Sequence, residues 1–405
     1  MFKIEGVSMN EVLLKQAQEI QPKLVEIRRD LHRHPETGFD LKYTVEKVRQ
    51  ELIKIGCEPV DCGKAGLVVL VGGKKPGKTL MLRADMDALP LGEEADIDYK
   101  SEYPGKMHGC GHDMHTSMLL GAAMLLKKHE EEIKGTVKLV FQPAEEIFQG
   151  SLDMIKAGVL ENPHVDAAVM IHVTSGMPIP AGMLMIPAGG ISMSSCEQYH
   201  ITITGKGGHG STPHMAIDPI TVAAQVHLAL QEINSRELDP RAYGVFTTCK
   251  FRAGETSNVI PNTAEMWGTI RTADAEGKIG EQIKQRMQEI AQGISVAMRC
   301  EAKVEFYDYC PCMVVNRELS DSTLRYMKEL IGQGAIAISE QGGGSEDFAF
   351  VSHEVPTVGM FLTAGSSKEG YEFGLHHPKM KLDDSILWEG SAAHAYLALR
   401  WLEEN

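Results

Sequence analysis

The feature that most constrains the fold of this sequence is the alternation of short apolar segments with amphipathic ones at both ends of the chain. In the first half, strands are expected at 66–71, 79–83, 136–141 and 165–171, and helices at 10–32, 44–55, 112–128 and 151–157. The same alternation of strands and helices resumes near residue 312, with a strand expected at 357–362 and a helix at 383–402. Apolar strands separated by helices are typical of a mostly parallel sheet covered by helices. The sequence therefore predicts an α/β domain assembled from both ends of the chain.

The central region follows a different plan. Half-buried strands are expected at 198–204, 245–251, 263–271 and 302–307, with helices at 218–233 and 277–297. This strand–helix–strand–strand–helix–strand order is that of a ferredoxin-like α+β domain. We therefore predict that a small domain, residues 192–310, is inserted into a larger one formed by residues 1–191 and 311–405.

Charge and composition exclude several classes of partner. The 405 residues carry 40 basic and 55 acidic side chains, a net charge of −15, and no Lys/Arg-rich run. Such a chain is poorly suited to bind phosphate backbones. No apolar run approaches the roughly 18 residues that a transmembrane helix needs, and the first residues lack the apolar segment of a secretory signal. The eight cysteines are scattered, unlike a disulfide framework. We expect a soluble, cytoplasmic protein without nucleic-acid or membrane partners.

Side chains of the kinds that bind metals follow several of the expected strands. They are Asp85, Asp87, Glu145, Glu146, His172, His376 and His377, and Cys110 and His112 stand at the start of the helix at 112–128. Ligands of an open parallel sheet bind beyond the carboxyl ends of its strands. A single Glu or His at the end of a strand is usually a helix cap or a solvated charge. That ordinary explanation does not account for the fact that all these segments end at one edge of the sheet. The sequence therefore predicts a transition-metal site.

Other kinds of site fit less well. Residues 205–210 match G-x-G-x-x-G after a strand, but the next helix starts only near Asp218, whereas a dinucleotide site needs it to open at the loop. The G-x-S-x-G pattern is absent from the sequence. Cys110 is of the right type for a thiolate nucleophile paired with His112. However, two residues that lie two positions apart and are flanked by glycines, as Cys110 and His112 are, are more naturally explained as ligands of one shared ion.

A series of motifs makes the chain similar to a known family. In order they are 31–36, 83–90, 107–113, 142–146, 205–214, 258–261, 345–348 and 376–378. Together they resemble the metal-dependent aminoacylase/carboxypeptidase family, and within it the N-acyl-amino-acid amidohydrolase branch that contains indole-acetyl-amino-acid and hippurate hydrolases. The resemblance implies a catalytic α/β domain with an inserted lid or dimerisation domain, which agrees with the boundaries drawn above.

The resemblance also implies a two-metal centre and assigns its residues. Cys110 matches the bridging thiolate, and the other ligands match His112, Glu146, His172 and His376. Glu145 matches the general base. His209, in the inserted domain, matches a histidine that reaches the active site of the partner subunit, so a homodimer formed through that domain is expected. Asn258 and Arg271 match residues near the substrate carboxylate. Zinc or manganese ions are expected first. Cobalt and nickel ions remain alternatives, because a site that mixes sulfur, nitrogen and oxygen ligands does not distinguish among these metals.

The function implied is metal-dependent hydrolysis of the amide bond of N-acyl amino acids, which releases a carboxylic acid and a free amino acid. Two neighbouring ions lower the pKa of a shared water, and Glu145 is placed to take its proton. A dipeptidase or carboxypeptidase with the same mechanism is the nearest alternative, and an N-acetyl-diaminopimelate deacetylase is a further one. A non-catalytic metal-binding scaffold is disfavoured because both Glu145 and the ligand set are intact.

Overall fold

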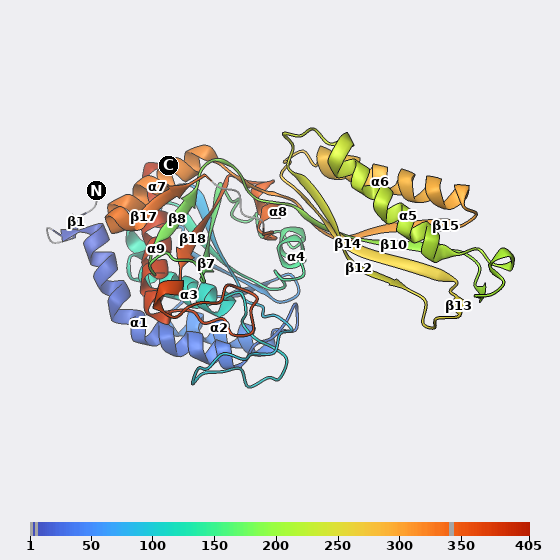
Figure 1. Cartoon of the computed structure of the whole chain (residues 1–405). Helices are drawn as coiled ribbons and strands as arrows, with labels where there is room; N and C mark the ends of the chain where they lie inside the picture. Colours follow the sequence, from blue (N-terminus) through green and yellow to red (C-terminus); the bar gives the residue numbers. More distant parts are fainter. Residues whose placement is uncertain (1–2, 5–6, 340–343) are drawn as a thin grey trace. The chain divides into compact units, whose positions relative to one another are not determined.

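The computed structural model of the chain describes residues 3–4, 7–339 and 344–405. It divides into two compact units, which are described separately (Figure 1). The first comprises the residues up to Ser192 and most of those from Val314 onward. The second comprises Met193–Met313 and a short stretch that ends at Ala349.

The first unit is built on an eight-stranded sheet with the order β17-β8-β18-β7-β5-β6-β4-β3. The strands are β3 (Val60–Cys62), β4 (Gly66–Gly72), β5 (Thr79–Asp85), β6 (Thr136–Gln142), β7 (Ala167–Thr174), β8 (Leu184–Pro187), β17 (Ala335–Ile338) and β18 (Thr357–Thr363). The pairs β17/β8, β18/β7, β7/β5 and β5/β6 are parallel, and the remaining three are antiparallel. The predicted mostly parallel sheet is confirmed.

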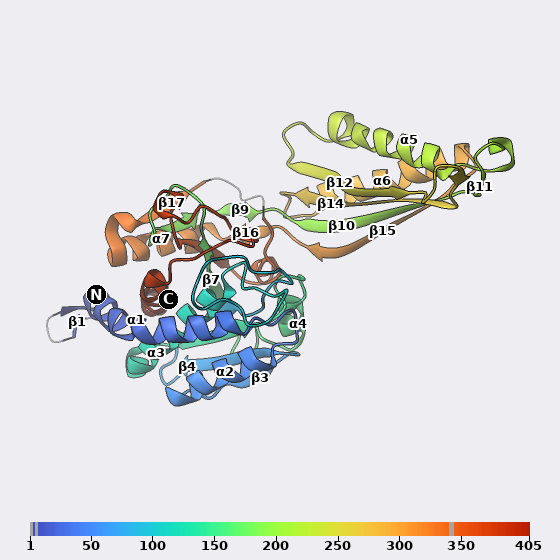
Figure 2. The ribbon, with the colours of Figure 1, turned by 60° about the horizontal axis from the view of Figure 1, so that its bottom comes forward.

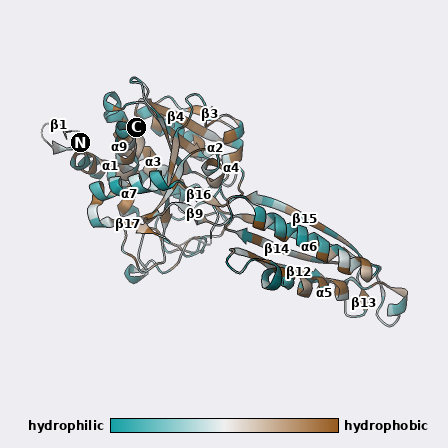
Figure 3. Cartoon of the chain, turned by 90° about the horizontal axis from the view of Figure 1, so that it is seen from above, coloured by the Kyte–Doolittle hydropathy of each residue, from teal (hydrophilic) through white to brown (hydrophobic). Residues whose placement is uncertain are grey.

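The helices of this unit bury the apolar faces of the strands. They are α1 (Met9–Arg33), α2 (Lys42–Lys54), α3 (His112–Lys128), α4 (Gly150–Lys156), α7 (Arg317–Ile331) and α9 (Leu387–Glu404). The short α8 (Ala349–Ser352) begins with the last residue assigned to the second unit and continues into the first. Helix α3 packs against β5 on one side and against α1 and α9 on the other, so it is apolar nearly all round (Figure 2). Helix α7 packs on β8 and β17 and keeps a hydrophilic outer face (Figure 3).

The second unit has the predicted ferredoxin-like architecture. Its elements follow in the order β10 (Cys196–Thr204), α5 (Pro219–Glu232), β12 (Gly244–Ala253), β14 (Thr263–Thr272), α6 (Lys278–Ala297) and β15 (Glu301–Cys310). The sheet order is β12-β14-β10-β15, all antiparallel, with β12 and β15 at the edges. Helices α5 and α6 cover one face around a separate apolar core (Figure 1). A short pair, β11 (Gly208–His209) and β13 (Val259–Ile260), extends beyond the Thr263 end of β14.

Two smaller two-stranded sheets complete the structure. One pairs β1 (Lys3–Ile4) with β2 (Val7–Ser8), and the other pairs β9 (Gly190–Met193) with β16 (Met313–Val315). Among the described helices, none combines the length and the apolarity that crossing a bilayer requires.

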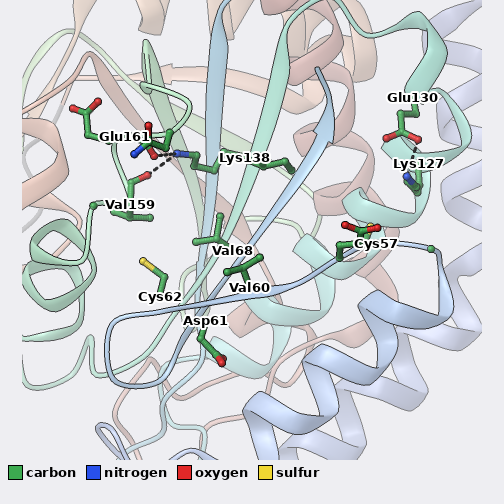
Figure 4. A pocket seen from close by; sticks show the side chains of 15 residues that line it. Cys57, Val60, Asp61, Cys62, Val68, Lys127, Glu130, Lys138, Val159 and Glu161 are labelled. Carbon is green, nitrogen blue, oxygen red and sulfur yellow. Dashed lines mark hydrogen bonds and ion pairs between the residues drawn. The ribbon is translucent and has the colours of Figure 1, made fainter. Parts of the chain in front are cut away.

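A lysine in the middle of β6 stabilises the first unit. Lys138 is buried, and its Nζ donates to the carbonyl oxygens of Val159, Glu161 and Pro163 at 2.8–2.9 Å. Figure 4 shows this side chain pointing from β6 to the loop, at the wall of a cavity lined in part by Val60. The ammonium group therefore satisfies three backbone carbonyl groups of the loop at 159–163.

We expect Lys138→Met to lower the free energy of unfolding by about 3 kcal/mol, because three partly buried carbonyl groups lose a charged donor. The midpoint of urea denaturation measures the effect. Lys100→Met, at an exposed position, is the matched control and should leave the midpoint unchanged. Equal midpoints for the two variants would show that Lys138 does not stabilise the loop.

Candidate metal centre

Side chains from four segments meet at the carboxyl ends of the central strands of the first unit. Cys110 and His112 stand at the start of α3, Glu145 and Glu146 follow β6, His172 lies in β7, and His376 follows β18. The structure thus brings together all five sequence-predicted ligands and the predicted base. One detail of the prediction is wrong: β7 continues to Thr174, so His172 lies within the strand rather than after it.

Cys110 lies at the middle of this group. Its Sγ is 3.6 Å from Nε2 of His172 and 3.3 Å from Nε2 of His376. Oε1 of Glu146 is 3.5 Å from the same nitrogen of His376. Cys110 belongs to two sets of possible ligands, one with His112 and His172 and the other with Glu146 and His376. A sulfur shared between two sets has the position that a ligand bridging two ions requires.

Asp87 holds the two adjacent glutamates in place. Its carboxylate oxygens accept the backbone N–H of Glu145 at 2.9 Å and that of Glu146 at 3.2 Å. Nε2 of His112 is 3.9 Å from Oε2 of Glu145 and 3.9 Å from Oε1 of Glu146. The two carboxylates therefore approach one histidine nitrogen from adjacent backbone positions.

Backbone acceptors set the tautomers of two of the histidines. Nδ1 of His112 lies 2.8 Å from the carbonyl oxygen of Asp87, and Nδ1 of His172 lies 2.7 Å from that of Val173. A carbonyl oxygen can only accept, so each Nδ1 carries the proton and each Nε2 offers a lone pair. This is the usual arrangement of metal-binding histidines, whose other nitrogen donates to a protein acceptor.

The residues fit a transition-metal cofactor. Among the described residues, Nε2 of His112 and Oε1 of Glu146 are buried atoms without a hydrogen-bond partner. Leaving such atoms unsatisfied costs roughly 1–3 kcal/mol each, and an ion between them would remove that cost. The mixture of thiol, imidazole and carboxylate donors is one that binds divalent transition ions.

Burial shifts the ionisation of Cys110 and Glu146 towards their neutral forms. It raises the pKa of the Cys110 thiol above its ordinary value and the pKa of Glu146 to about 7. Cations nearby reverse this effect because they stabilise the thiolate and the carboxylate.

The backbone is strained where it presents these side chains. Gly111, just before His112, has φ +84°, and a Cβ there would lie 2.4 Å from Cγ2 of Val173. Ala144 and His376 also have positive φ, 55° and 64°, although neither is glycine. Such outliers concentrate at functional sites because the surrounding structure must enforce them.

Two of the other predicted residues lie together at one end of the second unit. His209 pairs with Val259 in the short β11/β13 sheet, and the N–H of Gly210 donates to the carbonyl oxygen of Asn258 at 2.8 Å. Nδ1 of His209 accepts the backbone N–H of Ser211 at 3.1 Å. The exposed Nε2 therefore carries the proton and is a hydrogen-bond donor.

Arg271 lies near the opposite end of β14. Its Nη1 donates to Oγ of Ser345, which in turn donates to the carbonyl oxygen of Ser194 at 2.8 Å. Eight residues separate Arg271 from Thr263, where β14 begins, so the strand holds Arg271 and the His209 loop about 26 Å apart.

Sequence reasoning named Asp85 and Asp87 only as possible metal ligands, and it missed both His115 and the way in which these three groups support the site from behind. Asp85, Asp87 and His115 are buried, and each hydrogen-bonds to a segment that carries a candidate ligand. His115 could have been noticed, because it follows His112 by three residues and shares its face of α3. The cavity of Figure 4 contains none of these residues.

Comparison with known proteins gives consistent matches over nearly the whole chain. The model of "Peptidase family M20/M25/M40" matches residues 81–400. Thermostable carboxypeptidase 2 of Saccharolobus solfataricus is 36% identical over 397 residues, which cover 96% of this chain and 98% of that protein. N-acetylcysteine deacetylase of Bacillus subtilis is 34% identical over 383 residues, 94% of this chain and 97% of that one.

A solved structure agrees with these matches. The YXEP protein of Bacillus subtilis, described as a dinuclear metal-binding peptidase from the M20 family, superposes with a TM-score of 0.78 at 32% identity. The match covers 95% of this chain and 99% of that one.

Proposed function

Because the chain belongs to peptidase family M20/M25/M40, we propose that it is a metal-dependent amidohydrolase that removes the acyl group from N-acyl amino acids. The observation that carries this proposal is the arrangement of four donor side chains around Cys110, with a second carboxylate beside them. The first unit is the catalytic domain, and the second is a lid and dimerisation domain. A cytoplasmic location without nucleic-acid or membrane partners remains part of the proposal.

In this proposal Cys110, which is common to two sets of possible ligands, would hold two divalent ions together with His112, Glu146, His172 and His376. Bound ions supply Lewis acidity, which polarises the amide carbonyl and lowers the pKa of a water. Zinc or manganese is expected first, with cobalt or nickel as alternatives. Elemental analysis of the purified protein identifies the ions and their number.

Glu145 acts as the general base. Asp87 fixes the backbone of Glu145 and Glu146 alike, so the two carboxylates are held in a constant relation to each other. Glu145 takes a proton from the attacking water and returns it to the amide nitrogen, which must be protonated to leave. Oε2 of Glu145 lies 3.9 Å from Nε2 of His112, so the proposed base stands beside the proposed ligands.

His209 donates a hydrogen bond to the oxyanion, and Asn258 and Arg271 bind the substrate carboxylate. The tautomer of His209 supports the first role, because Nε2 carries the proton. The length of β14 bears on how these residues cooperate. Within one chain, Arg271 and the His209 loop are too far apart to contact one small substrate. Both can serve one site only if a second copy of the chain supplies one of them.

The second unit has a surface suited to such a dimer. Within the described part of the chain, strand β12 pairs only with β14, so its other edge offers backbone groups that no described strand pairs. Beside it α5 exposes Ile220 (40%) and Leu228 (70%), and β12 exposes Phe251 (43%). An apolar helix face next to an open strand edge is self-complementary under two-fold symmetry. We therefore expect a homodimer through the second unit.

A mixed dimer tests the role of His209. We expect His209→Ala and Glu145→Ala homodimers to be nearly inactive. A mixed dimer, isolated by two different tags, should recover one of its two sites. That site combines the intact Glu145 of one subunit with the intact His209 of the other. A mixed dimer no more active than its parents, or a strictly monomeric wild-type protein, would refute action across the dimer.

A substrate panel tests the proposed function. N-acetyl, N-benzoyl and indole-acetyl amino acids are compared with dipeptides and N-acetyl-diaminopimelate, each with and without added metal. We expect the N-acyl amino acids to have the highest kcat/KM. A preference for dipeptides would favour a carboxypeptidase or dipeptidase, which similarity to the Saccharolobus carboxypeptidase makes the second candidate. A marked preference for N-acetyl-diaminopimelate would favour the deacetylase of that compound.

A further inference from the structure

The end of β7 has a backbone problem that a side chain solves. On the β5 side, the pairing of β7 runs only as far as Met170, opposite Arg83. Val173 is fully buried three residues further on, so its N–H and C=O lack a strand partner on that side. Unpaired buried backbone groups are costly, and nearly all are satisfied in folded proteins.

Two histidines take the place of the missing strand. Nε2 of His115 accepts the N–H of Val173 at 2.8 Å, and Nδ1 of His172 donates to the C=O of Val173 at 2.7 Å. The ring centroids of His115 and His172 are 4.5 Å apart. The backbone of Val173 is therefore held at its N–H by a histidine of α3 and at its C=O by the candidate ligand that precedes it.

The orientation of His115 is itself determined by a buried relay. Because a backbone N–H can only donate, Nε2 of His115 is the acceptor and Nδ1 carries the proton. Nδ1 donates to Oδ1 of Asp85 at 2.6 Å, and Oδ2 of Asp85 accepts from Nη1 of Arg83 at 2.6 Å. All three side chains are at most 2% exposed. The ring cannot turn without breaking a buried, charge-assisted hydrogen bond.

We propose that His115 is a positioning residue that acts through the backbone of Val173 to aim Nε2 of His172 at the metal centre. The inference rests on the proposed function, because it takes His172 as a ligand. Both ring nitrogens of His115 are already engaged, one with Val173 and the other with Asp85. Although His115 forms a further group of possible ligands with Asp85 and His112, the proposal gives it no ligand atom. Its effect is to fix the carbonyl group that holds Nδ1 of His172.

Two conservative variants separate the two ends of the His115 ring. His115→Gln places an amide oxygen near the position of Nε2 and can still accept from Val173. His115→Asn places its amide near the position of Nδ1 and can still donate to Asp85. If aiming of His172 is the role of His115, the glutamine variant keeps it and the asparagine variant loses it.

The test is titration of metal-free enzyme with cobalt(II), followed by the absorption bands of cobalt bound to thiolate and imidazole. We expect His115→Asn to weaken binding of one of the two ions by about 10- to 100-fold, as loss of support for a ligand does. His172→Ala should affect the same ion, and His115→Gln should bind both ions like the wild type. Thermal unfolding of the metal-free variants serves as the folding control.

Equal weakening in the two variants would reduce His115 to a packing role and overturn the proposal, and so would wild-type affinity in both. If His115→Asn does not fold, the glutamine variant decides, because weakened cobalt binding there contradicts the proposal. A wild-type protein that binds two cobalt ions but hydrolyses no N-acyl amino acid would refute the proposed function. The titration would still decide the role of His115 in that case.

Discussion

Glu145→Gln is expected to lower kcat by about two to four orders of magnitude while leaving metal content and substrate binding close to those of the wild type. The amide keeps the size of the side chain but cannot take a proton from water. Steady-state kinetics on an N-acetyl amino acid, together with elemental analysis of the same preparation, measures both quantities.

The neighbouring residue is the matched control. Glu146→Gln should instead lose metal, because its buried Oε1 lies 3.5 Å from Nε2 of His376 and has no hydrogen-bond partner among the described residues. If Glu145→Gln lost metal while Glu146→Gln kept metal and lost only kcat, the two roles would be reversed. Such an exchange would mean that the base, rather than the ligand, lies beside His376.

Cys110→Ala is expected to abolish activity and to lower the metal content by at least one ion per chain. The alanine removes the atom shared by both sets of possible ligands. Inductively coupled plasma analysis after extensive dialysis measures the loss. Cys249→Ala, at an exposed position in the second unit, is the control and should keep full metal and rate.

Full metal content and rate in Cys110→Ala would refute the bridging role. A related expectation concerns oxidation, because the nucleophilic thiolate is the form that peroxide attacks. Peroxide should inactivate the wild-type enzyme, and thiols should restore part of the activity when oxidation has stopped at the sulfenic acid. The control variant Cys249→Ala should be inactivated at the same rate as the wild type.

The sequence was sufficient for the elements whose signals are local. Helix α3 runs from His112 to Lys128, as predicted, because a tight turn at Gly111 precedes a long apolar run that ends at two lysines. The strands β4, β5 and β6 were found for the same reason. In contrast, β3, β8 and β17 are three or four residues long, and their pairing depends on neighbours distant in the sequence.

The candidate site divides in the same way. Cys110, His112, Glu146, His172 and His376 could be selected because they are residues of metal-binding type that match a family motif. His377, which also follows β18, stacks on Phe373 with ring centroids 4.2 Å apart and is not part of the ligand group.

The supporting roles could not be inferred from the sequence, although Asp85 and Asp87 were named from it as possible ligands. Asp87 binds backbone N–H groups, and His115 answers a need created by the end of the pairing between β5 and β7. Neither contact can be recognised in the local sequence, because each depends on where one strand ends beside another.

The central claim is that two ions held around Cys110 are required for amide hydrolysis. Titration of metal-free enzyme with zinc or manganese, with bound metal and the rate of N-acetyl amino acid hydrolysis measured on the same samples, tests it most directly. The account predicts no hydrolysis without metal and a rate that rises with bound metal to a plateau at two ions per chain. Full activity in the metal-free enzyme, or a rate independent of bound metal, would contradict it.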